Sequence, residues 1–177
     1  MRARGASAAA GTRLATAADA AAIARIYNDG IADRVATFET EPRSTAEIER
    51  ALRERAGRYP TVVVELDGAV AAWAAASLYR PRECYAGIGE FSVYVARDAR
   101  GRGLGRIAMN ALIAESERRG LWKLVSRIFP ENAASLALCR ALGFREVGTY
   151  RRHGKVDGEW KDVVIVELLV GEARDRG

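Results

Sequence analysis

The sequence predicts one domain of the mixed α/β class, built on a sheet that is partly antiparallel. The chain has 177 residues, about the length of one domain, and its 49% apolar content is enough to fill a core. Two helical patterns come first, and a run of strand patterns joined by tight turns follows. Strand and helix patterns then alternate to the end. This order differs from that of a pure βαβ array.

The two N-terminal helices are marked by residues that resemble capping boxes. Thr16 with Asp19 precedes one run of apolar residues at helical spacing, and Ser44 with Glu47 precedes another. Pro60 ends the second helix, because proline removes a helical hydrogen bond and its ring clashes with the preceding turn.

After Pro60 the apolar period changes to that of strands. Thr61–Leu66 predicts a strand, and Asp67-Gly68 predicts a hairpin turn into a second strand over Ala69–Leu78. Tyr85–Val95 is a third strand-like segment. These three segments form a strand meander.

The rest of the domain alternates between the two kinds of element, with a second turn at Asp157-Gly158. The predicted segments are a helix over Gly103–Arg119, a strand over Leu121–Ile128, a helix over Asn132–Leu142 closed by Gly143, and strands over Val147–Arg152 and Val163–Val170.

The two ends of the chain differ in composition from the part between them. Residues 1–11 are rich in Ala, Gly and Ser without apolar periodicity, so we expect a disordered tail. Residues 171–177 form a short polar end. No repeat or long linker interrupts residues 12–170, which predicts a single domain over that range.

The net charge of +5 gives little support for nucleic-acid binding. Arg2, Arg4 and Arg13 lie in an N-terminal stretch without acids, and the rest of the chain has 25 basic and 23 acidic residues. No patch of interleaved aromatic and basic residues accompanies them. We therefore expect no nucleic-acid partner.

Composition also argues against a metal centre, a disulfide scaffold and a membrane span. The single histidine, His153, rules out zinc sites built on several histidines, and Cys84 and Cys139 have no CxxC partner. Two cysteines are too few for a disulfide scaffold, which favours the reducing cytoplasm. The longest apolar run, Ala69–Leu78, has about half of the ~20 residues that a membrane helix needs.

A glycine-rich loop is the sharpest local motif. The apolar segment Val93–Val95 leads to Gly101-Arg102-Gly103-Leu104-Gly105-Arg106, which opens the third predicted helix. Glycines let the backbone approach a ligand closely, and free N–H groups at a helix N-terminus attract an anion. Arg100, Arg102 and Arg106 add positive charge. The loop therefore predicts a phosphate site.

Two nucleotide-binding motifs and a ligand-free turn are alternatives for this loop. Gly103-x-Gly105-x-x-Ala108 fits a dinucleotide fingerprint, but that fold wants an acid about 20 residues on, where this chain has Val125. A P-loop needs Lys followed by Ser or Thr after the glycines, and neither pair is present. A tight helix entry without a ligand stays open.

A third interpretation is a family resemblance. Arg100 to Gly105 has the pattern Arg-x-x-Gly-x-Gly after an apolar strand, which is similar to the acyl-CoA pyrophosphate loop of the GNAT N-acetyltransferase superfamily. Asn132-Ala133-Ala134-Ser135 and Leu142-Gly143-Phe144 resemble the last helix of that superfamily and the strand after it. The resemblance covers roughly residues 12–169.

This resemblance implies a GNAT-like fold, with a twisted, mostly antiparallel sheet and about four helices, and acetyl-CoA as co-substrate without a metal. Backbone groups of Val93 and Val95 would pair with the pantetheine arm, and an amide near Val95 would stabilise the oxyanion. The residues implied for cofactor binding are Val93, Tyr94, Val95, Arg100, Gly101, Arg102, Gly103, Leu104, Gly105, Arg106, Asn132 and Ser135. For Asn132, a simple helix cap is an equal alternative.

Four further segments resemble the phosphinothricin and arsinothricin N-acetyltransferases. They are Phe38–Pro42, Tyr79–Tyr85, Glu90–Val95 and Gly158–Val163. Arg-Pro-Arg with Cys-Tyr-Ala-Gly, and Glu-Phe-Ser-Val-Tyr-Val, look closest to the arsinothricin branch. The resemblance implies a cytoplasmic homodimer that acetylates the α-amino group of a toxic glutamate-like amino acid and confers resistance. There are two alternatives. The acceptor could be methionine sulfoximine or another small amino acid, or the chain could be an acyl-CoA-binding domain without catalysis.

Glu90 is the candidate general base for this reaction. In an extended strand Glu90, Ser92 and Tyr94 share one face, and a carboxylate inside an otherwise apolar strand is unexpected. An ammonium group must lose a proton before it attacks a thioester. Glu90 would take that proton directly or through water, or it would mainly hold the ammonium. A solvent-facing strand residue is the simpler alternative.

Arg80 and Arg82 are the candidate clamp for an anionic acceptor. They flank Pro81, so an extended backbone would point both side chains the same way. Arginine captures carboxylates and tetrahedral oxyanions through paired donors. Two solvated loop arginines are the simpler alternative. The resemblance also places Tyr27, Asn28 and Phe38 on the acceptor side, although core packing is an equal alternative for Tyr27.

Cys139 is a departure from the family pattern and a candidate general acid. Many members have Tyr at this helix position, and related phosphinothricin enzymes have His. A cysteine thiol of ordinary pKa, about 8.5, would match a CoA thiolate. A small apolar helix residue is the simpler alternative, which would leave Tyr94, Tyr150 or water as the acid. His153 is interpreted as a turn residue, or as part of the substrate rim.

Overall fold

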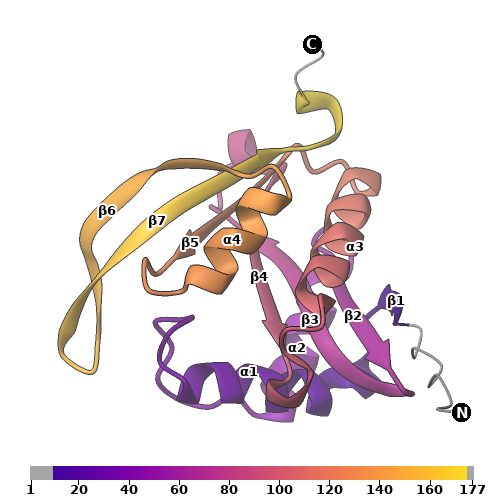
Figure 1. The fold of residues 1–177 in the computed structure, drawn as a ribbon. Helices are drawn as coiled ribbons and strands as arrows, with labels where there is room; N and C mark the ends of the chain where they lie inside the picture. The colour runs from indigo at the N-terminus through magenta and orange to yellow at the C-terminus, as the bar shows by residue number, and fades with distance from the viewer. Residues whose placement is uncertain (1–9, 175–177) are drawn as a thin grey trace, which may run out of the picture.

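The computed structural model describes residues 10–174 and contains one seven-stranded sheet with the order β1-β2-β3-β4-β5-β7-β6 (Figure 1). Neighbouring strands are antiparallel except for β4 and β5, which are parallel. This arrangement confirms the predicted mixed, mostly antiparallel class. The strands are β1 (Gly11–Leu14), β2 (Thr61–Leu66), β3 (Ala69–Leu78), β4 (Ile88–Val95), β5 (Lys123–Ile128), β6 (Arg145–Val156) and β7 (Glu159–Leu169).

Four α-helices pack on this sheet within the described residues, and all four were predicted. They are α1 (Ala20–Ala32), α2 (Thr45–Arg55), α3 (Leu104–Arg118) and α4 (Ala133–Ala141). The capping box before α2 is present: Glu47 N–H donates to Ser44 Oγ at 3.2 Å, and Ser44 N–H donates to Glu47 Oε2 at 2.7 Å. Before α1, Thr16 N–H donates to Asp19 Oδ2 at 2.7 Å.

Different helices pack on the two faces of the central strands. Trp73 and Tyr94 stack on one face with Tyr27 of α1 against them. On the opposite face, Phe91 packs against Phe144, which follows α4. Residues alternate between the two faces along β3 and β4, so α1 and α2 cover one side of the sheet while α3 and α4 cover the other.

Both predicted Asp-Gly turns are confirmed. Asp67 and Gly68 have φ of 53° and 80°, and Asp157 and Gly158 have φ of 50° and 85°. Two successive positive φ values match the right-handed twist of the strands that they join. The second turn closes the long β6–β7 hairpin, which extends beyond the rest of the sheet in Figure 1.

Strands β4 and β5 separate after a short common segment. Their register runs only from Ile88 opposite Lys123 to Glu90 opposite Val125. Beyond Glu90, β4 continues to Val95 along β3, whereas β5 continues along β7. The sheet therefore opens into a splay at its centre, and this splay positions the site.

Three parts of the fold differ from the sequence prediction. The short edge strand β1 was not predicted, and it begins at Gly11, the last residue assigned to the N-terminal tail; residues 1–9 of that tail lie outside the described part of the chain. Strands β6 and β7 are longer than predicted because their exposed, polar ends lack alternation. In the C-terminal segment, Gly171–Ala173 form one 3₁₀ turn, and residues 175–177 are not described.

His153 also lies elsewhere than expected. It belongs to β6, where the register with β7 shifts between Tyr150 and Gly154, so it is in a bulge and not in the turn. Its ring packs 5.1 Å from that of Tyr150. Within residues 10–174, none of the helices is long and apolar enough to cross a membrane.

Candidate active site

A cavity of about 420 Å³ lies where β4 and β5 separate. Its walls come from the end of β4, the glycine loop, the first turns of α3 and α4, and the segment around the end of α1. Of the twelve residues predicted to bind the cofactor, all except Arg102 line it. The lining also includes Gly30, Asp33, Val35, Ala36, Ala134 and Leu138.

The glycine loop has the backbone conformation that its sequence predicts. Gly101 and Gly103 have φ of 74° and 79°, in the left-handed region that side chains disfavour, and Gly103 is the N-cap of α3. In the described chain, the N–H groups of Leu104 and Gly105 have no backbone partner, whereas Arg106 N–H donates to Gly103 O at 3.1 Å. With the helix dipole, they form a site suited to a phosphate group.

Arg100 is neutralised by an acid that the sequence analysis did not identify. Its Nη2 donates to Asp33 Oδ2 at 2.8 Å, and Arg97 Nη2 donates to Asp33 Oδ1 at 2.7 Å. These two guanidinium groups hold the pKa of the Asp33 carboxyl below its ordinary value. Arg100 therefore ties the loop to α1 and contributes less free charge than expected, while exposed Arg102 points outside the cavity lining and Arg106 lies within it.

The end of β4 presents unpaired backbone groups to the splay. Ala96 N–H donates to Ala71 O on β3 at 2.8 Å, so by alternation the backbone groups of Val93 and Val95 point away from β3. Two contacts agree with this orientation, because Phe91 O accepts from Ser126 Oγ at 3.0 Å and Val95 O from Arg100 Nε at 3.4 Å. The alternation leaves Val93 N–H, Val93 O and Val95 N–H directed into the opening.

The start of α4 forms the opposite wall. Asn132 Oδ1 accepts a hydrogen bond from Ser135 N–H at 3.2 Å, so Asn132 is an N-cap and also lines the cavity. Cys139, one turn further on, is only 2% exposed and borders a narrow extension of about 50 Å³. Burial, with a smaller contribution from Glu146, raises the pKa of the Cys139 thiol to about 11. The expected match between this thiol and a CoA thiolate is therefore not present.

Glu90 lies at the last paired position before the splay, and its carboxylate is not isolated. Oε1 accepts from Arg127 Nε at 3.1 Å and forms an ion pair with the same guanidinium. Ser92 and Tyr94 follow on the same face, toward the cavity. Arg127 borders the narrow extension beside Cys139, so the Glu90–Arg127 pair lies next to the opening.

The tyrosines differ in their suitability as acids. Tyr94 lines the cavity, and burial raises the pKa of its phenol well above the ordinary value, so it stays protonated. Burial also raises the pKa of Tyr27, which contacts both Tyr94 and Trp73 edge-on. Tyr150 is exposed on β6.

The predicted clamp arginines do not converge on a buried site within this chain. Both are exposed in the segment after β3, and each lies over an aromatic ring: Arg80 is 5.2 Å from the Tyr79 ring centre and Arg82 is 5.8 Å from that of Tyr85. Their stacking holds them at the end of β3 that is nearer to Glu90. In this chain the two guanidinium groups lie over separate aromatic rings, and their role as an anion clamp stays a prediction.

Two predicted acceptor residues, Asn28 and Phe38, make contacts within the chain, and their role in acceptor binding stays a prediction. Asn28 Nδ2 donates to Arg43 O at 2.9 Å and Arg43 N–H donates to Asn28 Oδ1 at 2.8 Å, so its amide helps to fix the segment before α2. The Phe38 ring packs edge-on against Phe129 at 4.8 Å, and Gly154 leaves it room under the β6–β7 hairpin. Tyr27 packs edge-on against Trp73 and Tyr94, which agrees with the core-packing alternative given for it.

An α/β fold with a splayed strand pair, a glycine loop at a helix start and a cavity between them defines a class of acyl-CoA-dependent transferases. Sequence comparison agrees, because residues 23–144 match the family described as Acetyltransferase (GNAT) family. The chain belongs to this family of acetyltransferases.

Curated and solved relatives cover nearly the whole chain. An L-methionine sulfoximine/L-methionine sulfone acetyltransferase of Pseudomonas aeruginosa is 35% identical over 92% of this chain and 95% of its own length. A phosphinothricin N-acetyltransferase of Streptomyces viridochromogenes is 36% identical over 85% and 82%. A crystal structure of a phosphinothricin acetyltransferase from Sinorhizobium meliloti in complex with acetyl-CoA has a TM-score of 0.84 and 34% identity, over 95% and 92% of the two chains.

Proposed function

We propose that this acetyltransferase moves the acetyl group of acetyl-CoA to the α-amino group of a small, toxic, glutamate-like amino acid. Phosphinothricin and arsinothricin are the acceptors that its sequence favours, and acetylation would confer resistance to them. Support comes from the related phosphinothricin enzyme and from the Arg-Pro-Arg and Glu-Phe-Ser-Val-Tyr-Val segments of this chain.

The observation that carries the proposal is the position of Glu90 at the start of the splay. On one side of it lies a cavity with a phosphate-binding loop and unpaired strand backbone, which fits the pyrophosphate and the amide-bearing arm of acetyl-CoA. On the face of α1 and α2, Glu90 offers a carboxylate to an ammonium group. The residues of this chain therefore fit both reactants at one opening.

In the reaction, the ammonium group loses a proton to Glu90, directly or through water. The free amine then attacks the thioester carbon, so a C–N bond forms while the C–S bond breaks. Val95 N–H is the donor best directed to stabilise the oxyanion. The nitrogen then releases its second proton, and the departing thiolate takes up a proton through water, because burial raises the pKa of both the Cys139 thiol and the Tyr94 phenol and makes them poor donors.

Methionine sulfoximine is a second candidate acceptor, favoured by the relative from Pseudomonas aeruginosa. Thiol release from acetyl-CoA, measured with phosphinothricin, arsinothricin and methionine sulfoximine, separates the candidates. We expect kcat/KM to be highest for one of the two acceptors with an anionic side chain. Highest turnover of methionine sulfoximine would move the assignment to the second candidate, and no turnover of any of the three would reject both.

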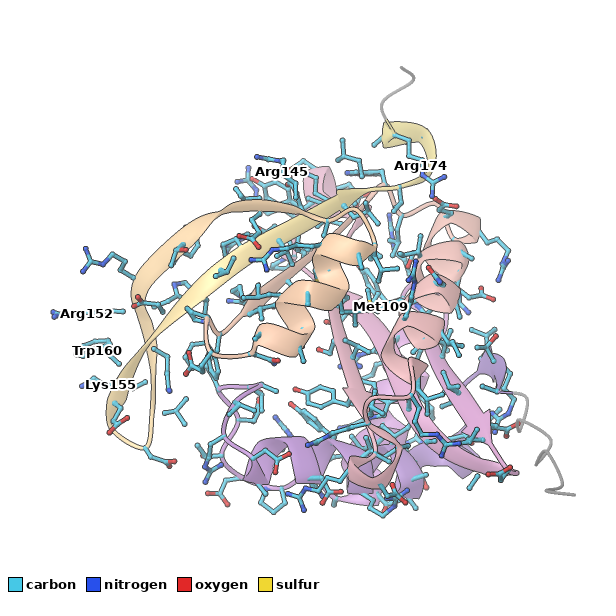
Figure 2. All side chains as sticks on the ribbon, viewed as in Figure 1. Met109, Arg145, Arg152, Lys155, Trp160 and Arg174 are labelled. Carbon is cyan, nitrogen blue, oxygen red and sulfur yellow. The ribbon has the colours of Figure 1, made fainter. Side chains whose placement is uncertain are left out.

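We also propose that the enzyme is a cytoplasmic homodimer. The β6–β7 hairpin projects from the body with exposed Val147, Tyr150 and Trp160, and Figure 2 shows Arg152, Lys155 and Trp160 at its outer edge. Such a surface suits a second copy of the chain. Light scattering that gives the mass of a 19.2 kDa monomer would contradict the proposal.

A further inference from the structure

A second, smaller pocket of about 90 Å³ lies under α1 and α2, on the face of the sheet that carries Glu90. We call it the α2 pocket and define it by Arg55, Thr61, Trp73, Ser77 and Ser92, which line it together with apolar side chains of the two helices. Its polar residues come from four elements, α2, β2, β3 and β4.

Arg55 is the single charged residue that lines this pocket in the described chain. It is half-buried at the last turn of α2, and within residues 10–174 its guanidinium has neither an ion pair nor a hydrogen bond to another residue. Burial lowers its pKa from the ordinary value, but arginine remains charged at neutral pH. Tyr27 and Glu54 raise that pKa by less than burial lowers it, and neither forms an ion pair or hydrogen bond with the guanidinium, which leaves this partly buried cation able to bind an anion that is not part of the chain.

Two buried donors beside Arg55 also lack partners. Trp73 and Thr61 are 5% and 8% exposed, and neither Trp73 Nε1 nor Thr61 Oγ1 has a hydrogen-bond partner in the described chain. Native proteins satisfy most such groups. Both side chains belong to the pocket lining, so a bound polar group would find neutral donors next to the guanidinium.

Ser92 connects this pocket to the site of the reaction. It lies on β4 between Glu90 and Tyr94, on the same face as both. It lines the α2 pocket and also the narrow extension that contains Arg127 and Cys139. A molecule that reaches from the α2 pocket past Ser92 therefore arrives beside Glu90 and the splay.

We propose that the α2 pocket binds an oxyanion group of the acceptor amino acid, with Arg55 as its counter-charge. This inference rests on the proposed function and names the substrate class: a free amino acid that carries a carboxylate or a tetrahedral oxyanion. Guanidinium groups bind such oxyanions through paired donors. A pocket of this size fits one functional group on a short chain and is too small for a folded protein N-terminus.

The test compares Arg55→Gln with Arg50→Gln, which removes the same charge from an exposed position of the same helix. Calorimetry measures the Kd of phosphinothricin, methionine sulfone and the carboxamide of methionine sulfone, and separately that of acetyl-CoA. We expect Arg55→Gln to weaken phosphinothricin binding at least tenfold without changing the Kd of acetyl-CoA. Arg50→Gln should match the wild type in every measurement.

The three acceptors identify which oxyanion is bound. Loss of both phosphinothricin and methionine sulfone binding assigns the α-carboxylate, because methionine sulfone has no other anionic group. Loss of phosphinothricin binding alone assigns the side-chain oxyanion. Binding of the carboxamide should not depend on Arg55 in either case.

Unchanged affinity for both anionic acceptors in Arg55→Gln would overturn the inference, and so would a wild type that binds neither. If Arg55→Gln does not fold, as judged by circular dichroism and acetyl-CoA binding, Arg55→Lys and Thr61→Val replace it. Turnover is measured separately. If acceptor binding depends on Arg55 but no acceptor is turned over, the proposed function is rejected and the role of the α2 pocket is kept. If acceptors are turned over but their binding does not depend on Arg55, the proposed function is kept and the role of the pocket is rejected.

Discussion

The cofactor side and the acceptor side of this site are built by different means. On the cofactor side, the groups aimed at the cavity are mainly backbone: N–H groups at the start of α3 and the unpaired edge of β4 beyond Glu90. On the acceptor side, the polar groups are side chains, among them Glu90, Arg127 and Arg55. The first side depends on glycine conformations and strand register, whereas the second depends on single side chains.

This difference implies that substitutions disrupt ligand binding on the two sides in different ways. A backbone site keeps its donors when a side chain changes and loses them when the chain path changes. A side-chain site loses a specific charge with a single substitution while the fold persists. Substitutions on the two sides should therefore give separable effects on catalysis, cofactor binding and stability.

Glu90→Gln should lower kcat about 10²-fold, because the amide cannot accept the proton of the ammonium group. The Kd of acetyl-CoA should not change, since the cofactor side does not use this carboxylate. Steady-state kinetics and calorimetry measure the two quantities. Glu159→Gln, at an exposed position of β7, is the matched control. A kcat within threefold of the wild type would remove Glu90 from the role of base.

Gly103→Ala should raise the Kd of acetyl-CoA at least tenfold, because a Cβ disfavours φ of 79° at the N-cap of α3 and shifts the donors. Gly120→Ala is the control, since Gly120 has φ of 74°, equally open surroundings and a position at the far end of α3. Both variants should lose about 1 kcal/mol of unfolding free energy. Equal loss of acetyl-CoA affinity in both would show that the loop has no special role.

Cys139→Ala should leave kcat within about threefold, because the raised pKa of this buried thiol makes it a weak proton donor. Loss of the buried sulfur should cost about 1 kcal/mol of unfolding free energy, measured in urea. Cys84→Ala, at an exposed site, should change neither quantity. A fall in kcat of thirtyfold or more, with normal acetyl-CoA binding, would restore Cys139 as the general acid.

Asp33→Asn should have the smallest effect. It should lower the unfolding free energy by less than about 1 kcal/mol at neutral pH, since the arginine partners of Asp33 are half exposed. Because the folded-state pKa of Asp33 is lowered, its contribution is complete above the unfolded pKa of about 3.9 and is lost as pH falls below it. The unfolding free energy, measured in urea, should therefore change less between pH 7 and pH 3.5 in the variant than in the wild type. Asp67→Asn, in an exposed turn, should leave the difference unchanged.

The same contrast explains what the sequence could and could not predict. The Asp-Gly turns, the capping box before α2 and the glycine loop depend on local backbone preferences, so short motifs were enough to find them. Strand β1 has four exposed residues and no alternation, so its pairing with β2 depends on distant contacts. No local pattern predicts it.

Side-chain pairs on both sides were harder to predict because their partners come together only in the fold. On the acceptor side, Arg127 lies 37 residues after Glu90, and on the cofactor side, Asp33 lies 67 residues before Arg100. Asn28 had the right chemistry for a substrate contact, but a backbone segment 15 residues away engages its amide. Arg55 ends a largely polar helix, and only tertiary packing distinguishes it from Arg50 and Arg53.

The splay of β4 and β5 also couples the stability of the protein to its metabolic surroundings. In the described chain, the edge of β4 beyond Glu90 that faces the splay has no neighbouring strand, and an amide-bearing co-substrate that paired with it would stabilise the folded chain as a ligand does. At one hundred times its Kd, such a ligand adds about 2.7 kcal/mol. The folded fraction of the enzyme, and with it the rate of its degradation, should therefore follow the supply of acetyl-CoA in the cell.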